Sequence, residues 1–90
     1  MDIEFDARKR NKTLSERGLD FARAGEIFTG HHFTAPDLRY DYGEDRYITV
    51  GTLDGRMVVV VWTPRGSVHR VISMRKANDR EQARYAQKLG

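Results

Sequence analysis

The sequence predicts an α+β fold in which a small antiparallel sheet is preceded by two helices and followed by one. The clearest sign is the dipeptide Asp54-Gly55, a two-residue hairpin signal that stands just before the continuously apolar run of residues 57–62. Residues 20–30, in contrast, repeat apolar side chains at helical spacing. With 90 residues, of which 39% are hydrophobic, the chain can bury one core, so we expect a single domain over residues 1–90.

The first third of the chain predicts one strand and two helices. Residues 2–5 can form a short strand, after which Asp6 is a suitable N-cap for a helix over about residues 7–16. Asp20 is a second N-cap, and the helix that it opens is the better signalled of the two because apolar residues recur on one side of it. These residues are Phe21, Ala24, Gly25 and Phe28. The two helices are expected to end at Gly18 and Gly30.

The remainder predicts a meander of three or four strands and a final helix. The expected strands cover residues 31–35, 46–53, 57–62 and 68–74, with a loop at 36–45 and turns at Asp54-Gly55 and at residues 64–66. Asn78 and Glu81 have the spacing of a capping box, which predicts a last helix through Leu89. The order of elements therefore predicts an α+β domain.

Strand alternation predicts which side chains face the helices. We expect the helices to cover one face of the sheet and the other face to stay open to water or to a ligand. The residues predicted to face the helices are Ile48, Val50, Ile72 and Met74. Those predicted on the open face are Tyr47, Thr49, His69, Ser73 and Arg75. Arg46 and Arg70 share the parity of the core residues, so we expect each of them near a strand end.

Charge is distributed unevenly along the chain, whose formal net charge is +3. Residues 1–17 carry +1, residues 18–64 carry −3 and residues 65–90 carry +5. This segregation suggests a polyanionic partner, either nucleic acid or another anion, and a solvated charged surface is the alternative that charge alone leaves open. The absence of cysteine excludes disulfides, thiolate nucleophiles and thiolate metal sites. No apolar run has the length of a signal or a membrane span, so we expect a soluble cytoplasmic protein.

Four cations stand where the first predicted helix begins, and they oppose its macrodipole by ~0.3–1 kcal/mol each. They are Arg8, Lys9, Arg10 and Lys12. A local rule broken without compensation indicates a functional site, here one that binds RNA. The alternative is that neighbouring acids, such as Asp2, Glu4 or the acidic loop at residues 36–45, pair with these cations.

The three histidines do not predict a metal site. His31 and His32 are adjacent on a predicted strand and point to opposite faces, and His69 is distant in sequence. His69 is a candidate general acid or base, although an ordinary surface histidine is the simpler interpretation. Tyr47 and Trp62 are aromatic residues that suit core packing better than base stacking.

With these residues in view, the chain resembles the BrnT family of toxins from type II toxin–antitoxin systems. Four segments carry the resemblance: Phe5-Asp-Ala-Arg-Lys9, the helix pattern of Gly18, Phe21, Ala24 and Phe28, Glu44-Asp-Arg46 followed by Gly51, and Arg70-Val-Ile-Ser-Met-Arg-Lys-Ala77 with Glu81 and Tyr85. The chain departs from the family pattern at Arg17, Thr13 and Met74, where histidine, asparagine and alanine are usual. If the family histidine contributes to activity, its replacement by Arg17 weakens the activity of this chain.

The resemblance implies a RelE-like fold, RNA cleavage that inhibits translation, and neutralisation by a BrnA-type antitoxin. Such an antitoxin carries a ribbon-helix-helix domain, so contact with DNA would be indirect. No cofactor and no membrane are implied. The alternative is a non-catalytic basic module that binds RNA or protein, and the same face could also bind the antitoxin.

Metal-independent RNA cleavage requires a base for the 2′-hydroxyl, cations for the charge on phosphorus and an acid for the leaving oxygen. We expect Arg46, Arg70 and Arg75 to stabilise the charge, with support from Lys9. His69 is the first candidate for proton transfer, followed by Glu44 and Tyr47. Expected RNA contacts are Arg8, Arg10, Lys12, Arg17, Tyr47, Ser73 and Lys76.

Overall fold

The computed structural model describes residues 2–89, which form a five-stranded sheet with helices on both of its faces. The elements are β1 (Asp2–Phe5), α1 (Ala7–Arg17), the short 3-10 helix η1 (Phe21–Arg23), α2 (Ala24–Thr29), β2 (His32–Pro36), β3 (Tyr47–Leu53), β4 (Arg56–Arg65), β5 (Val68–Lys76) and α3 (Asp79–Leu89). The α+β class is confirmed, and the second predicted helix is divided into η1 and α2.

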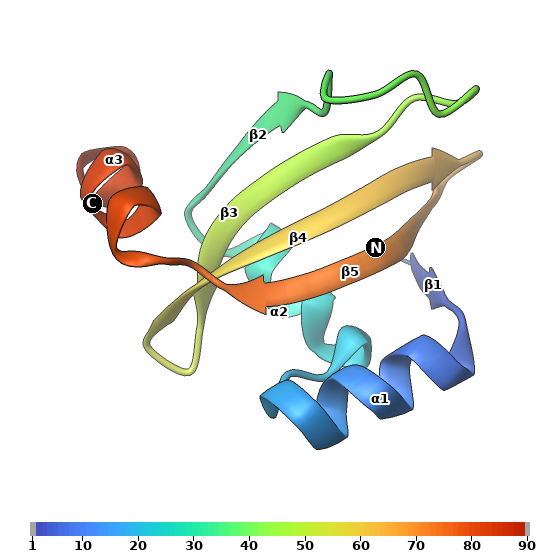
Figure 1. Cartoon of the computed structure of the whole chain (residues 1–90), viewed down its shortest axis with the longest axis horizontal. Coiled ribbons are helices and arrows are strands. Elements are labelled where there is room, and N and C mark those ends of the chain that lie inside the picture. The colour runs from blue at the N-terminus through green and yellow to red at the C-terminus, as the bar shows by residue number, and fades with distance from the viewer. Residues whose placement is uncertain (1, 90) are drawn as a thin grey trace.

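The strands are arranged in the order β1-β5-β4-β3-β2 (Figure 1). Strands β2 to β5 form an antiparallel meander, and β1 joins its far edge parallel to β5. The predicted hairpin is confirmed, with Asp54 and Gly55 both at positive φ in the turn. β4 is longer than predicted, since it continues through Pro64 to Arg65 before the turn at Gly66.

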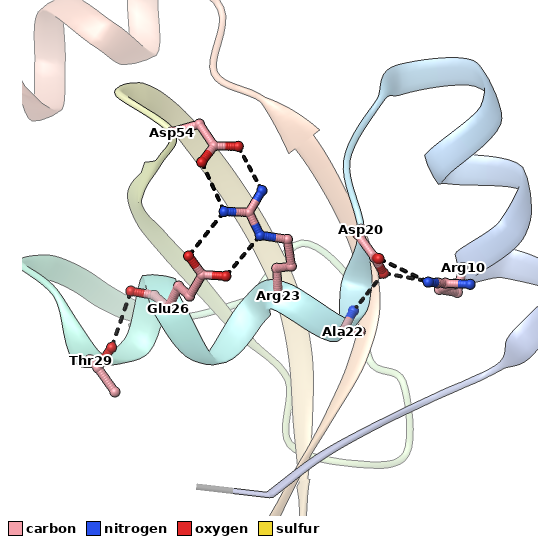
Figure 2. Close-up of polar contacts among 7 residues, drawn as sticks. All are labelled: Arg10, Asp20, Ala22, Arg23, Glu26, Thr29 and Asp54. Atoms are coloured by element: carbon pink, nitrogen blue, oxygen red, sulfur yellow. Dashed lines mark hydrogen bonds and ion pairs between the residues drawn. The ribbon is translucent and has the colours of Figure 1, made fainter.

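Helix α1 begins and ends where the sequence predicts. The Asp6 side chain accepts a hydrogen bond from the Lys9 backbone N–H, and Gly18 adopts the left-handed conformation with φ 68°. Arg10 of α1 makes two hydrogen bonds to Asp20, which also caps η1 by accepting from the Ala22 N–H (Figure 2). One of the four early cations is therefore compensated within the fold.

A second ion-pair group ties the helical segment to the β3–β4 turn. Arg23 binds the carboxylates of both Glu26 and Asp54 through four hydrogen bonds of 2.6–3.0 Å (Figure 2). All three side chains are exposed to solvent, so each pair contributes little to stability. These contacts orient η1 and α2 on the sheet rather than supply most of the stability.

The main core lies between α2, η1 and one face of the sheet. Its fully buried members include Phe21 and Ile27 from the helical segment and Val58, Val60 and Met74 from the strands. We call this face the helix face. A smaller cluster of Val50, Val59 and Ala77 lies on the opposite face. Tyr85 and Leu89 of α3 pack against this cluster. The expectation that helices cover one face only is therefore wrong, because α3 packs on the other face.

A β-bulge in β5 changes the predicted alternation. Val61 pairs with Ser73 and Trp62 with Val71, so Ile72 is an extra residue between them. Val71 and Met74 are three positions apart, yet both belong to the main core, which a regular strand could not achieve. Residues on the two sides of Ile72 therefore follow opposite parities, and a single alternation rule fails along this strand.

Candidate functional site

The face opposite the main core carries the three arginines that the sequence singles out. Trp62 and Val71 belong to the main core, so their strand neighbours Thr63 and Arg70 point the other way. Arg46 directly precedes β3 and shares this side, since Tyr47 packs on the core. Arg75 pairs with Val59 of the smaller cluster and also lies here. We call the surface of Arg46, Arg70 and Arg75 the arginine face.

The bulge brings these arginines together. Arg70 and Arg75 are an odd number of residues apart, and only the extra residue Ile72 places both on one face. Extending the β3–β4 register by one residue sets Arg46 opposite Thr63, which itself pairs with Arg70. From strand spacings, Arg46 and Arg70 have Cα atoms ~10 Å apart, and Arg75 lies ~13 Å further along β5.

Each of the three arginines already has a carboxylate partner. Arg46 donates to Glu44 at 3.1 Å, Arg70 lies 3.1 Å from Glu4, and Arg75 is 2.7 Å from Glu81. The Glu4 carboxylate is 47% exposed and that of Glu44 is 31% exposed. A partly exposed pair is weak enough for a phosphate to displace the carboxylate, so these two arginines can still bind an anion.

Arg75 is held more firmly than the other two. Both of its terminal nitrogens donate to Glu81, which also accepts from the Asn78 backbone N–H, while Asn78 accepts from the Glu81 N–H. The predicted capping box is confirmed, and it doubles as the link between β5 and α3. The Arg75 guanidinium and these hydrogen bonds lower the pKa of Glu81 to about 2. Arg75 is thus committed to positioning α3 at the edge of the arginine face.

The loop between β2 and β3 adds two groups that sequence reasoning did not select. The buried Asp37 carboxylate accepts two hydrogen bonds from the Arg39 side chain, and these hold the pKa of Asp37 at about 2. Tyr42 donates to the same carboxylate at 3.3 Å, and its ring lies 3.9 Å below the Arg46 guanidinium carbon. The only signal in the sequence was the mixture of acids, tyrosines and arginines in the loop.

His69 and Tyr47 are not on the open face, so these two placements are wrong. The His69 ring stacks on Trp62 at 4.1 Å and contacts Phe28 at 4.9 Å, which places it on the helix face. Tyr47 stacks on the other side of the same Trp62 at 5.1 Å. Burial lowers the pKa of His69, so the ring is neutral near pH 7. The aromatic row fills the core, and neither residue lies beside the arginines. Thr49, also placed on the open face, instead accepts from the Trp62 indole N–H on the helix face.

The predicted cations of α1 divide into two groups. Arg10, an expected RNA contact, forms an ion pair with Asp20 that links α1 to η1. Lys9, Lys12 and Arg17 line a cleft between α1 and β5, together with Ser73. Arg8 is exposed, and Lys76 lies at the end of β5 in register with Val58, away from the arginine face.

The described residues contain no cluster of three or more histidine, aspartate or glutamate side chains that could hold a metal ion. Glu4 is a site neighbour that sequence reasoning did not select as functional. The alternation of β1 could have indicated its position, because Ile3 and Phe5 face the core and Glu4 between them must face away from it.

Fold and site together define a small α+β domain with a cationic sheet face, a class suited to a polyanionic partner. Residues 5–81 match the family described as ribonuclease toxin, BrnT, of type II toxin-antitoxin system. The match covers most of the chain, so the chain belongs to the BrnT family of ribonuclease toxins. Membership implies an antitoxin partner and an RNA target. No curated protein matches the chain. Within residues 2–89, no helix has the length and apolar character that crossing a membrane requires.

Proposed function

We propose that this protein is an endoribonuclease toxin that cleaves RNA on its arginine face without a metal ion and so inhibits translation in the cytoplasm. The observation that carries this proposal is the bulge in β5, which sets Arg70 on the same face as Arg46 and Arg75 within a family of ribonuclease toxins. The α+β sheet order also agrees with a RelE-like fold, which we propose for the family.

The chemistry needs charge stabilisation above all. Arg46 and Arg70 exchange their carboxylate partners for the oxygens of the scissile phosphate, and their planar guanidinium groups remain charged throughout. Glu44, released by Arg46, accepts the proton of the 2′-hydroxyl. The 2′-oxygen attacks phosphorus, the bond to the 5′-oxygen breaks, and that oxygen takes a proton from water. The hydroxide ion that remains takes the proton from Glu44, which restores the carboxylate and the water molecule. The products are a 2′,3′-cyclic phosphate and a 5′-hydroxyl. Lys9 stabilises the substrate strand from α1.

The partner that we propose is a BrnA-type antitoxin with a ribbon-helix-helix domain, through which the complex reaches DNA. A segment that covers the arginine face with acidic side chains would take the places of Glu4 and Glu44 and exclude RNA. Inhibition then follows from occupation of the site.

The second candidate is a basic module that binds RNA or protein without cleaving RNA. The ion pairing of all three arginines and the position of His69 on the other face favour it, because they leave no ready acid–base pair. The two candidates differ in what a change from arginine to lysine does, since binding tolerates it and bidentate charge stabilisation does not.

The test is cleavage of a labelled RNA by the purified protein and by its Arg46→Lys and Arg70→Lys variants. We expect each variant to cleave RNA ~10²-fold more slowly than the wild type, while its affinity for RNA stays within about two-fold of the wild-type affinity. Arg56→Lys, at the exposed start of β4 and in no ion pair among the described residues, is the matched control and should cleave normally. Absence of cleavage by the wild-type protein, with RNA binding intact, would establish the non-catalytic candidate instead.

A further inference from the structure

A cleft of about 170 Å³ lies between α1 and β5, outside the arginine face. Its lining residues are Lys9, Lys12, Thr13, Glu16, Arg17, Phe21, Ile72 and Ser73. The volume corresponds to roughly five or six water molecules at ~30 Å³ each, which suits a small polar group such as a phosphate. Three cations and one carboxylate line it, so the cleft is electropositive.

The cations of this cleft are not paired with carboxylates, in contrast to many arginines in the described part of the chain. Arg10, Arg23, Arg39, Arg46, Arg70 and Arg75 each lie in an ion pair with a carboxylate. Among the described residues, Lys9 and Lys12 have no carboxylate within salt-bridge distance, and Arg17 donates to the backbone oxygen of Met74 at 2.8 Å. Lys9, Lys12 and Arg17 are therefore available to an external anion, and they differ from other cations that are unpaired within residues 2–89, such as Arg8 and Arg56, because they line one common cleft.

The geometry of β5 explains why the cleft exists. β1 pairs with β5 only from Val68 to Val71, so the strand edge beyond that point has no strand partner. α1 runs beside this part of β5 instead, below the sheet in Figure 1, and Ile72 of the bulge lines the cleft between them. A helix does not complete a strand edge as another strand does, and the Arg17 side chain donates to the Met74 carbonyl there.

Ser73 connects the cleft to the arginine face. It lines the cleft, and its register with Val61 places it on the same side of the sheet as Arg70 and Arg75. The path from one site to the other therefore crosses a single strand, a width of ~5 Å. A chain of phosphates bound across β5 would place one phosphate on the arginine face and a neighbouring one in the cleft.

We propose that the cleft binds a backbone phosphate of the RNA next to the one that is cut, with Lys9, Lys12 and Arg17 as its ligands. The proposal rests on the proposed ribonuclease function and adds the direction of the substrate strand, which runs across β5 toward α1. Lys9 and Lys12 position the substrate from a site separate from the reacting phosphate.

The test is the affinity of the protein for a single-stranded RNA with 2′-O-methyl groups, which cannot be cleaved, measured by fluorescence anisotropy at several salt concentrations. The variant is the double substitution Lys9→Gln and Lys12→Gln, which leaves the Asp6 cap intact because Lys9 contributes only its backbone N–H. We expect affinity to fall at least ten-fold and the slope of log affinity against log salt to shrink by about 0.7.

The double substitution Arg56→Gln and Arg80→Gln is the matched control, since it also removes two positive charges, from exposed residues that do not line the cleft. We expect a fall of less than two-fold for this variant, and an equal loss in both variants would overturn the proposal. Binding of inorganic phosphate to the wild type and to the Lys9→Gln and Lys12→Gln double variant is a second measurement. If Lys9 and Lys12 are needed to bind phosphate but that double variant binds RNA as tightly as the wild type, the cleft does not bind RNA. If the wild type neither binds nor cleaves RNA, the proposed function itself fails.

Discussion

Individual side chains show that charge in the sequence is a poor guide to charge available for binding. Arg10 looked like a nucleic-acid contact, yet it bridges α1 and η1 through Asp20. The pairing is invisible in the sequence because the partners are ten residues apart and meet only when the chain turns at Gly18. Arg70 and Glu4 are further apart still and meet through the parallel β1–β5 pair. Tertiary contacts therefore decide which cations remain open.

At this scale, the pairing of Arg70 leads to a prediction about RNA affinity. Glu4→Gln removes the carboxylate that competes with phosphate for Arg70, and an exposed pair of this kind is worth ~0.2–1 kcal/mol. We therefore expect the variant to bind the non-cleavable RNA about two- to five-fold more tightly. Glu26→Gln, which removes a partner of Arg23 on the helix side, should leave the affinity unchanged. Equal affinities for wild type and Glu4→Gln would place Arg70 off the RNA path.

The elements themselves were largely predictable, whereas their faces were not. Asp6, Gly18, Asp54-Gly55 and the capping box at Asn78 act through neighbours in sequence, so their effects follow from the sequence alone. The bulge at Ile72 has no such local signal, because it depends on how β5 fits against β4. Because Ile72 is an extra residue, the strand residues before it point to the opposite faces from those that simple alternation with the residues after it predicts. That one residue accounts for much of what the alternation rule misplaced on β5.

Contact between α2 and β3 gives a second prediction, which concerns stability. A Cβ at Gly51 would lie 2.6 Å from the Cγ2 atom of Ile27, a fully buried side chain, so Gly51→Ala forces the helix and strand apart. We expect a loss of ~1–3 kcal/mol in the free energy of unfolding, measured with urea. Gly25→Ala, in α2 with open space around its Cβ, should instead be neutral or stabilise by ~0.5–1 kcal/mol. Equal stability of the two variants would contradict the close contact between Gly51 and Ile27.

The whole molecule divides into a main core without carboxylates and a periphery held by them. Asp37 fixes the loop between β2 and β3, and Glu81 fixes α3 through Arg75, so these two groups lie at the flanks of the arginine face. The core beneath α2 and η1 has no such dependence, since its members are apolar or are uncharged residues such as Thr49. The surroundings of the site should therefore respond to acid before the core does.

Acid should weaken the fold through Asp37 and Glu81. Both have pKa values of about 2 in the folded protein, below the ordinary 3.8 and 4.5 of the unfolded chain. A lowered folded pKa gives stability that is complete above the unfolded value and is lost as pH falls through the folded one, so the window is about pH 5 to pH 2. Because the partners Arg39 and Arg75 are 57% and 43% exposed, we expect only about 1 kcal/mol from each group.

Urea unfolding at pH 7, 5 and 3 measures this loss, and a double variant with Asp37→Asn and Glu81→Gln isolates its source. The double variant should be less stable than the wild type at pH 7, and its stability should change less between pH 5 and pH 3. The decline that remains belongs to the other carboxylates whose pKa values arginine partners lower, such as Asp20. An undiminished decline in the double variant would assign the acid sensitivity to those groups and not to the flanks of the arginine face. Conversely, a flat profile with RNA binding retained would show that the flanks stabilise the site without contacting the substrate.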